Sequence, residues 1–246
     1  MREHKPRGLS GDTRLTKRTL SAAAIILIAI PAVIAWGITA LEDRRYYLIS
    51  LIIIALSMVP FALIFERRRP QAREMVVIAV LTAIAVAGRA AMYMIPQFKP
   101  VVAIVIITGV SFGGESGFIT GALAGFISNM FIGQGPWTPW QMFSFGIIGF
   151  LAGVLFKKGL LKRNRAALCV FGGISTFFIY GAIMDTASLF MFSSTVSWKG
   201  LLASYISGIP FNVIHAAATM FFLFILANPM LEKLLRIKKK YGILEP

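Results

Sequence analysis

Charged residues are scarce in this chain, making up 14% of its 246 residues. A soluble domain would carry about a quarter. Hydrophobic residues make up 57%, and the mean hydropathy is +0.78. The apolar runs are long enough to cross a bilayer and are apolar on every face, which excludes the alternating strands of an outer-membrane barrel. The sequence therefore predicts an all-α, polytopic membrane protein.

Cysteine and the common catalytic motifs are also rare or missing. The single cysteine, Cys169, excludes a disulfide framework and a thiolate metal cluster. The chain has no GxxxxGK[ST] phosphate-binding loop, no HExxH zinc motif and no paired-carboxylate motif. We therefore expect no metal site, no cofactor, no ATP hydrolysis by this chain and no enzymatic activity.

Eight apolar segments are predicted to be membrane-spanning helices. They are Ser21–Leu41, Tyr46–Phe65, Met75–Ile95, Val101–Gly113, Gly117–Ile132, Met142–Phe156, Leu168–Phe192 and Leu201–Ala227. The first follows a basic region, as a cleaved signal peptide would, but it is long and lacks a small-residue cleavage site. We interpret it as a retained helix.

Acidic residues are few, and the net charge is +15. Twenty of the 25 Lys and Arg residues lie in segments 1–20, 66–74, 157–165 and 228–246, which the eight spans place on one side. The positive-inside rule makes that side, with both termini, cytoplasmic. The charge is thus explained by topology and by attraction to anionic lipid, so we do not expect nucleic-acid binding.

The chain divides by composition into three parts. Residues 1–74 hold a basic cytoplasmic tail, a transmembrane hairpin and a basic linker. Residues 75–227 form a six-helix core, rich in glycine and with polar residues inside its helices. Residues 228–246 are a basic cytoplasmic tail. The core is the expected substrate-binding part.

Polar residues inside the core helices are costly in a bilayer unless they have a partner or face a water-filled cavity. Arg89, Asp185 and Asn129 fall in the outer half of their spans, which favours a cavity open to the outside. A salt bridge from Arg89 to Asp185 that only locks the bundle is the alternative. Asn212 lies one turn before His215 on the same helix face, so the two could form the floor of a pocket. A histidine that merely packs is the alternative there.

The segment FIGQGPWTPWQM, residues 131–142, interrupts two apolar runs with prolines, glycines and two tryptophans. It is predicted to be the outer loop between spans five and six. Its prolines restrict the backbone and reduce the entropy lost on ordering. Trp137 and Trp140, with Tyr93 and Phe98, are then candidates for the rim of the pocket. Ordinary interfacial anchoring is the alternative, and it is the better explanation for Trp198.

Small residues four apart make a smooth strip on the third span, at Ala79, Ala83 and Ala87. Such strips let another helix approach closely, either within the bundle or from another subunit. Similar glycine spacings in spans five and six are assigned to internal packing.

Gly114-Glu115-Ser116-Gly117 matches the GxSG pattern of rhomboid-type proteases. An intramembrane hydrolase using Ser116 is therefore a rival hypothesis, although its candidate base His215 lies about half a bilayer away.

The stretch from Met75 to Lys158 resembles the substrate-binding S components of energy-coupling factor (ECF) vitamin transporters. The residues that carry the resemblance are GRAA at 88–91, FKP at 98–100 and QGPWTPWQM at 134–142. It covers the six-helix core, and the subgroup most similar is the one assigned to cobalamin. The N-terminal hairpin is a departure from a minimal S component.

The resemblance implies a function in a prokaryotic cell membrane. S components bind a vitamin in an outward-facing pocket, dock with a membrane T component and two ABC-type ATPase subunits, and release the vitamin inward. Docking uses alanines spaced four apart on the first core helix, which match Ala79, Ala83 and Ala87. ATP is used by the partners and not by the S component. A standalone permease or a membrane scaffold is the remaining alternative.

Overall fold

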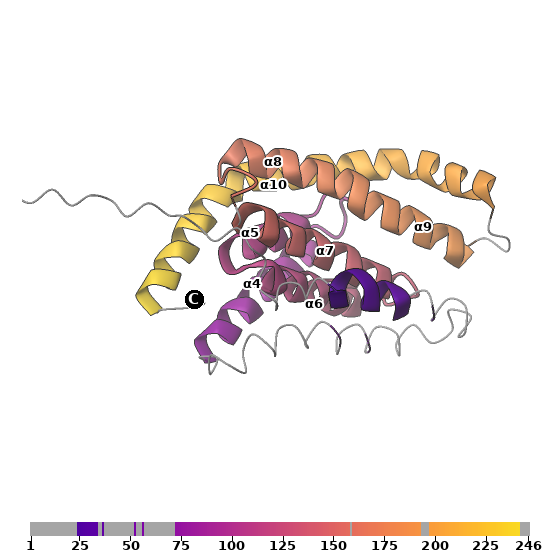
Figure 1. Cartoon of the computed structure of the whole chain (residues 1–246). Coiled ribbons are helices and arrows are strands. Elements are labelled where there is room, and N and C mark those ends of the chain that lie inside the picture. Colours follow the sequence, from indigo (N-terminus) through magenta and orange to yellow (C-terminus); the bar gives the residue numbers. More distant parts are fainter. Residues whose placement is uncertain are drawn as a thin grey trace, which may run out of the picture.

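The computed structural model describes residues 24–33, 36, 52, 56, 72–157, 159–192 and 197–241. Every regular element in these residues is helical (Figure 1). The elements are η1 (Ile25–Ala29), α4 (Ala72–Ala91), α5 (Val101–Phe112), α6 (Gly114–Ile132), α7 (Thr138–Lys157), α8 (Arg165–Ile174), η2 (Ser175–Tyr180), α9 (Gly181–Phe192) and α10 (Trp198–Tyr241).

Three of the described helices are long and apolar enough to cross a membrane, which indicates a membrane protein. They are Thr138–Phe156, the continuous run Arg165–Phe192 and Trp198–Tyr241. The apolar parts of α4 and α5 are shorter. In the part of the chain before the core, residues 1–74, which we call the N-terminal appendage, residues 24–33 are helical. Most of the hairpin and the basic tail 1–20 lie outside the described residues. The all-helical prediction is confirmed, whereas eight spans remain a prediction.

The six predicted core helices correspond to α4, α5, α6, α7, the run α8–η2–α9, and α10. Asn164 caps the N-terminus of α8, where its side chain accepts a hydrogen bond of 2.7 Å from the backbone N–H of Ala167. The last helix differs from the prediction. It continues past Ala227 to Tyr241 with Pro229 inside it, so the segment expected to be a tail is largely helical.

The end of α10 changes direction instead of stopping. Figure 1 shows its final, yellow part turned away from the line of the rest, in the region that contains Pro229. Proline removes one helical hydrogen bond and its ring clashes with the preceding turn. It therefore bends the helix without ending it where the segments before and after it are both packed against the rest of the protein. Leu234, beyond the bend, is buried and supplies that packing.

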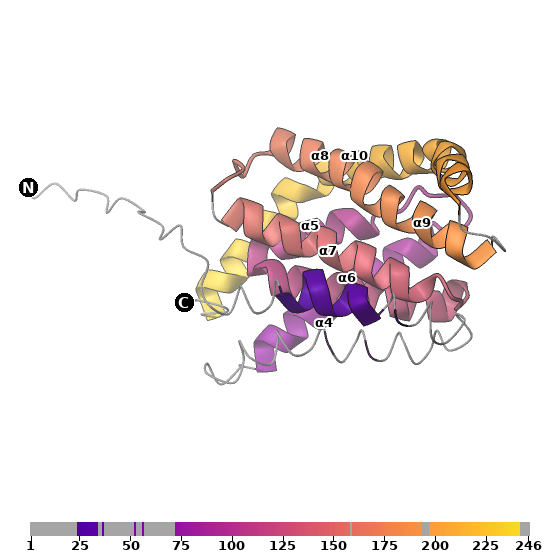
Figure 2. The same cartoon turned by 45° about the vertical axis from the view of Figure 1, so that its right-hand side comes forward.

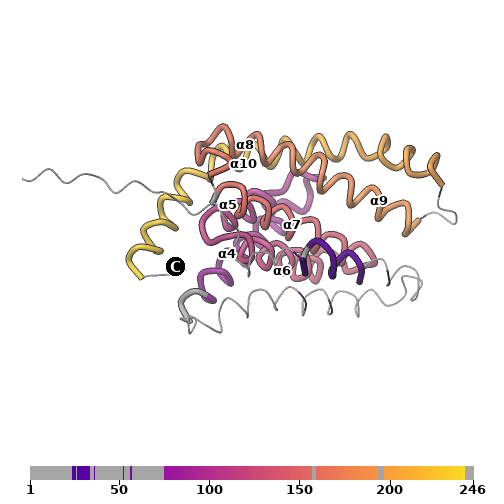
Figure 3. The backbone as a smooth tube through the Cα atoms, in the orientation of Figure 1, coloured from indigo at the N-terminus to yellow at the C-terminus, as the bar shows by residue number. Residues whose placement is uncertain are grey.

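The centre of the molecule is α5, which packs against α4, α6, α7 and α10. Eleven of its twelve residues are buried. Figure 3 shows α5 and α7 between the pair α8 and α10 on one side and α4 and α6 on the other. A helix enclosed on all sides has no polar face, which explains why its sequence is apolar throughout.

Glycines set the close approach of α5, α6 and α7. A Cβ on Gly109 would lie 2.2 Å from the backbone oxygen of Gly149, and one on Gly117 would lie 2.4 Å from the same atom. A Cβ on Gly121 would lie 2.5 Å from the backbone of Phe145. The predicted role of Gly121 and Gly149 in internal packing is confirmed, and Gly109 and Gly117 take part in the same close contacts.

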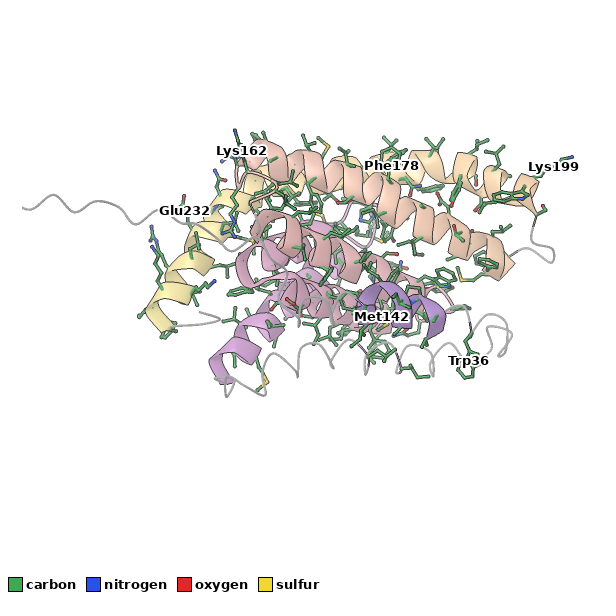
Figure 4. All side chains as sticks on the ribbon, in the orientation of Figure 1. Trp36, Met142, Lys162, Phe178, Lys199 and Glu232 are labelled. Atoms are coloured by element: carbon green, nitrogen blue, oxygen red, sulfur yellow. The ribbon has the colours of Figure 1, made fainter. Side chains whose placement is uncertain are left out.

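The helices alternate in direction, so the connections gather at two ends of the bundle (Figure 2). The 133–137 connection lies at one end, and the 92–100 connection on the same side is recessed, because Phe98 packs against Phe221 and Phe222 well past the start of α10. The 159–164 connection lies at the other end. Figure 4 shows Lys199 at the first end and Lys162 with Glu232 at the second.

Candidate functional site

Arg89 is the centre of a buried polar network. It lies in the last turn of α4 and is 8% exposed. Its Nη1 donates to Ser128 Oγ and, over 2.8 Å, to Asn129 Oδ1 on α6. Its Nη2 donates to Gln141 Oε1 on α7 over 3.1 Å. One guanidinium therefore joins three helices, and all three acceptors are neutral.

A second layer of bonds fixes the acceptors. Asn129 Nδ2 donates to Thr138 Oγ1 and to Gln141 Oε1, each over 3.0 Å. The Thr138 hydroxyl donates to Gln134 Oε1 over 2.8 Å, and Gln134 Nε2 donates to the backbone oxygen of Phe126 over 3.0 Å. These bonds tie the 133–137 loop to the end of α6. The polar residues of FIGQGPWTPWQM thus hold the loop in place and orient the partners of Arg89.

The 92–100 connection is held by Lys99. Its Nζ donates to the backbone oxygens of Met92, Tyr93 (3.2 Å) and Ile95 (2.6 Å). Burial lowers the pKa of the Lys99 ammonium below its ordinary value, and the nearby positive charge of Arg89 lowers it further. Gln97 in this connection has φ of +55°, a left-handed backbone conformation that is uncommon outside glycine.

A cavity of about 220 Å³ lies between the 92–100 connection and the helices beneath it. Its walls come from the end of α4, the 92–100 connection, the start of α5, the end of α6, and from α7, η2 and α10. The lining residues are Arg89, Tyr93, Pro96, Gln97, Lys99, Val101, Ile132, Gln141, Phe145, Tyr180 and His215.

Three rings form one wall of the cavity. Phe145 and Tyr180 stack with their ring centroids 5.2 Å apart, and His215 meets Tyr180 edge-on at 4.5 Å. The Arg89 guanidinium lies 5.6 Å from the centroid of Phe145. His215 is 2% exposed, and neither of its ring nitrogens has a hydrogen-bond partner among the described residues. A buried imidazole in that condition is rare, because an unmade hydrogen bond is costly.

The structure brings together part of the predicted set. Arg89, Tyr93 and His215 line the cavity, and Asn129 lies directly behind Arg89. Phe98 instead contacts Phe221 and Phe222 on α10, with ring centroids 5.6 and 5.4 Å away.

The two tryptophans of the loop also lie away from the cavity lining. Trp140 stacks on Phe190 of α9 with centroids 6.1 Å apart. Trp137 lies over Gly135, where a Cβ would come within 2.4 Å of the indole ring. Neither tryptophan lines the cavity, and their role at the rim of a ligand site stays a prediction.

Asp185 and Asn212 form a separate polar pair between α9 and α10. Asn212 Nδ2 donates to Asp185 Oδ2 over 2.8 Å, and Ser204 Oγ donates to the Asp185 backbone oxygen over 2.6 Å. Gly208 makes room for the carboxylate, since a Cβ there would lie 2.3 Å from Asp185 Oδ1. Arg89 and Asp185 form no ion pair within the described residues, so the salt-bridge alternative is wrong.

Sequence reasoning missed several residues of the site. Gln141 and Tyr180 line the cavity, and Gln141 Nε2 approaches the Tyr180 hydroxyl at 3.5 Å. Gln141 lies within the unusual WTPWQM segment, so it carried a signal, whereas Tyr180 is one of several polar residues in its helical run and did not stand out. Lys99 and Phe145 gave none, because a loop lysine and a helical phenylalanine are commonplace.

The hydrolase hypothesis finds no Ser–His contact in this geometry. Ser116 lies in the first turn of α6, and from there to Asn129 the helix rises roughly 20 Å at 1.5 Å per residue. His215 faces the cavity near the Asn129 end and has no hydrogen-bond partner among the described residues. Ser116 and His215 are therefore not paired as nucleophile and base.

The alanine strip lies in a second, larger concavity. An open groove of about 620 Å³ runs between α4 and α6. Ala79, Ala83 and Ala87 are exposed along one side of it, and Leu123, Ile127 and Phe131 belong to its α6 side. Gly88 and Arg89 follow directly on α4, so one helix carries the groove on its outer face and the cavity network at its end.

The fold and these two features define a helical protein with apolar helices of membrane-spanning length, a small polar cavity at one end and an apolar groove on one side. The chain belongs to a family of unknown function (DUF6580), which it matches over residues 69–238. The match covers the six-helix core and leaves out the N-terminal appendage.

Curated relatives are similar to part of the chain. A UPF0397 protein of Aliivibrio fischeri strain MJ11 is 30% identical over 130 residues, which is 47% of this chain and 70% of that relative. A UPF0397 protein of Vibrio atlanticus is 33% identical over 99 residues, covering 38% of this chain and 52% of that relative. A third, of Aliivibrio salmonicida, is 32% identical over 114 residues. No solved structure matches the chain.

Proposed function

We propose that this protein is the substrate-binding S component of an ECF-type importer in a prokaryotic cell membrane. In this role it captures a vitamin or related micronutrient in the cavity beside Arg89 and delivers it inward. The observation that carries the proposal is the cavity beside Arg89, which combines a buried cation, unpaired imidazole nitrogens and an aromatic wall. Concave sites with a few convergent polar groups on apolar walls are where proteins bind small molecules.

The groove on α4 supports the transport part of the proposal. An exposed strip of small residues on an apolar helix allows close approach of a helix from another membrane subunit. Ala79, Ala83 and Ala87 supply that strip, and the groove beside it has room for apolar side chains. A T component docked there would contact the same helix that carries Arg89 in its last turn, and two ATPase subunits bound to the T component would supply the energy.

Cobalamin is the vitamin that the subgroup resemblance favours. A corrinoid is several times larger than a cavity of about 220 Å³. Binding it would require the walls of the cavity to move apart, including the 92–100 connection that Lys99 holds in place. A smaller micronutrient fits without that change.

Co-expression with T and ATPase subunits tests the proposal. We expect the full chain to co-purify with all three partner subunits, and vesicles containing the complex to accumulate substrate only when ATP is supplied inside. Uptake by the isolated chain without ATP would identify a permease instead. A chain that neither assembles nor transports would be a scaffold, and the proposal would be wrong.

A further inference from the structure

We infer that the cavity takes a small, flat organic anion whose carboxylate is bound by Arg89. This inference rests on the binding role proposed above and names the chemical class of its ligand.

The charge of the lining carries the first step. Arg89 and Lys99 both line the cavity, and its eleven lining residues include no aspartate or glutamate. The side chains that accept hydrogen bonds from Arg89 are a hydroxyl and two amides, which satisfy N–H groups without neutralising the charge. Lys99 likewise donates to backbone carbonyls. A buried cation without an anionic partner is costly, and a bound anion would remove that cost.

The free donors of Arg89 carry the second step. A guanidinium has five N–H groups in a planar fork. Three are used in the bonds to Ser128, Asn129 and Gln141. Because those bonds fix the orientation of the fork, the remaining donors are already placed before a ligand arrives. Arginine held in this way suits a carboxylate better than a neutral amide, since the hydrogen bonds are then charge-assisted.

The volume limits the size of the ligand. At about 30 Å³ for each water molecule, a space of about 220 Å³ holds roughly seven waters, or a compact ligand of roughly ten non-hydrogen atoms. Pockets for drug-sized ligands begin at about 300 Å³. A single aromatic ring with one carboxylate meets this limit.

The aromatic wall beside the charge determines the body of the ligand. Phe145 and Tyr180 stack on each other and both line the cavity, and aromatic side chains favour contact with another flat ring. The unpaired nitrogens of His215 lie beside them. A neutral imidazole can donate through one nitrogen and accept through the other. A ring nitrogen or a hydroxyl on the ligand would supply the missing partner.

Matched probes test the charge and the ring nitrogen separately. Nicotinate, nicotinamide and benzoate have the same number of non-hydrogen atoms, and calorimetry on the purified full chain in neutral detergent measures their affinities. We expect nicotinate to bind at least about tenfold more tightly than nicotinamide, because only nicotinate can form charge-assisted bonds with Arg89. We expect benzoate to bind about fivefold more weakly than nicotinate, because it gives His215 no partner.

Variants assign each preference to its residue. Arg89→Gln should reduce the nicotinate-to-nicotinamide ratio to about one, and Arg89→Lys should leave an intermediate ratio because it keeps the charge and loses the fork. His215→Phe should remove the preference for nicotinate over benzoate. Arg165→Gln is the matched control: Arg165 lies at the start of α8, over the ring of Phe224, and should leave all three affinities unchanged.

The wild-type comparison alone decides the inference even if a variant fails to fold. Nicotinamide binding as tightly as nicotinate would overturn it, as would no binding of either carboxylate. In that event ATP-dependent uptake by the assembled complex would still support the proposed function. Selective carboxylate binding by a chain that never assembles with T and ATPase subunits would uphold the inference and reject the transport role.

Discussion

Arg89 shows how single residues set the chemistry of this protein. A charged group within apolar helices is expensive, and here neutral acceptors on α6 and α7 offset part of that cost. Its charge remains available because no acidic side chain lies in the cavity lining. The same residue therefore stabilises the bundle and prepares a site for an anion.

Gln141→Glu separates these two roles. The new carboxylate would lie 3.1 Å from Arg89 Nη2 and would neutralise it from within. We expect the midpoint of thermal unfolding to stay the same or rise. Nicotinate affinity should fall at least about tenfold, which corresponds to a loss of about 1.4 kcal/mol of binding free energy. Thermal melting and calorimetry on the same sample measure both. Unchanged nicotinate affinity would contradict the position assigned to Gln141.

Asp185 belongs to a different contact, and its substitution should have a different effect. Asp185→Ala removes the acceptor of Asn212 and leaves that amide unpaired, which costs about 1–3 kcal/mol. We expect a lower midpoint of thermal unfolding with nicotinate affinity unchanged. Asp185→Asn keeps an acceptor of the same shape and should be nearly neutral. A loss of nicotinate affinity in the well-folded Asp185→Asn protein would place Asp185 in the binding site.

At the scale of elements, helix spacing is controlled by glycine. α5, α6 and α7 approach so closely that backbone atoms of Gly109, Gly117 and Gly149 contact one another. Within a membrane, helices whose backbones approach this closely are held together by van der Waals contact between their backbones, without large interlocking side chains.

Gly149→Ala should therefore force these helices apart. Its Cβ would lie 2.5 Å from the Gly117 oxygen, and overpacking of this kind costs about 1–3 kcal/mol. Gly125→Ala is the matched control on α6, because its nearest neighbour would be 3.3 Å away. We expect a clear fall in the unfolding midpoint for Gly149→Ala and a small one for Gly125→Ala. Equal effects would show that the helix spacing is set elsewhere.

The groove on α4 makes a second prediction at this scale. Ala83→Leu would fill part of the groove and should weaken co-purification of the T component at least about tenfold while nicotinate affinity stays constant. Ala203→Leu is the matched control, since Ala203 is exposed on α10 away from the groove. Equal loss of assembly and of binding, or equal loss in both variants, would contradict docking at this strip.

For the whole molecule, the alternation of helices separates the connections into two groups. The cavity lies at the end with the 92–100 connection, and the 159–164 connection with its basic residues lies at the other. The distribution of Lys and Arg predicts that the cavity end faces outward.

Cysteine labelling tests this orientation. In a Cys169→Ser background, Met94→Cys and Leu160→Cys place single thiols at two exposed positions on opposite ends, with Met94 86% and Leu160 67% exposed. We expect an impermeant maleimide to label the first in intact cells and the second only after the membrane is permeabilised. The reverse pattern would invert the topology and place the cavity on the cytoplasmic side.

Sequence patterns predicted most of the fold because each core helix is a long apolar run bounded by glycine, proline or charge. The bounds of α5 and α6 were predicted to within three residues. The predicted end of the last helix, at Ala227, was wrong. Pro229 is a local signal for the end of a helix, and only the packing of Leu234 shows that the helix continues. The hairpin at residues 21–65 lies mostly outside the described residues and remains a prediction.

The sequence by itself determined the helical class, a packing role for glycines in two of the helices and the presence of polar residues that need partners. It could not determine which partners they find, because hydrogen bonds between residues 27 to 52 positions apart depend on how the helices meet. Only the tertiary structure joined Arg89 to Asn129 and Gln141 and Asp185 to Asn212. It also left His215 unpaired beside a small cavity, because stacked rings and not hydrogen-bonding groups surround that imidazole.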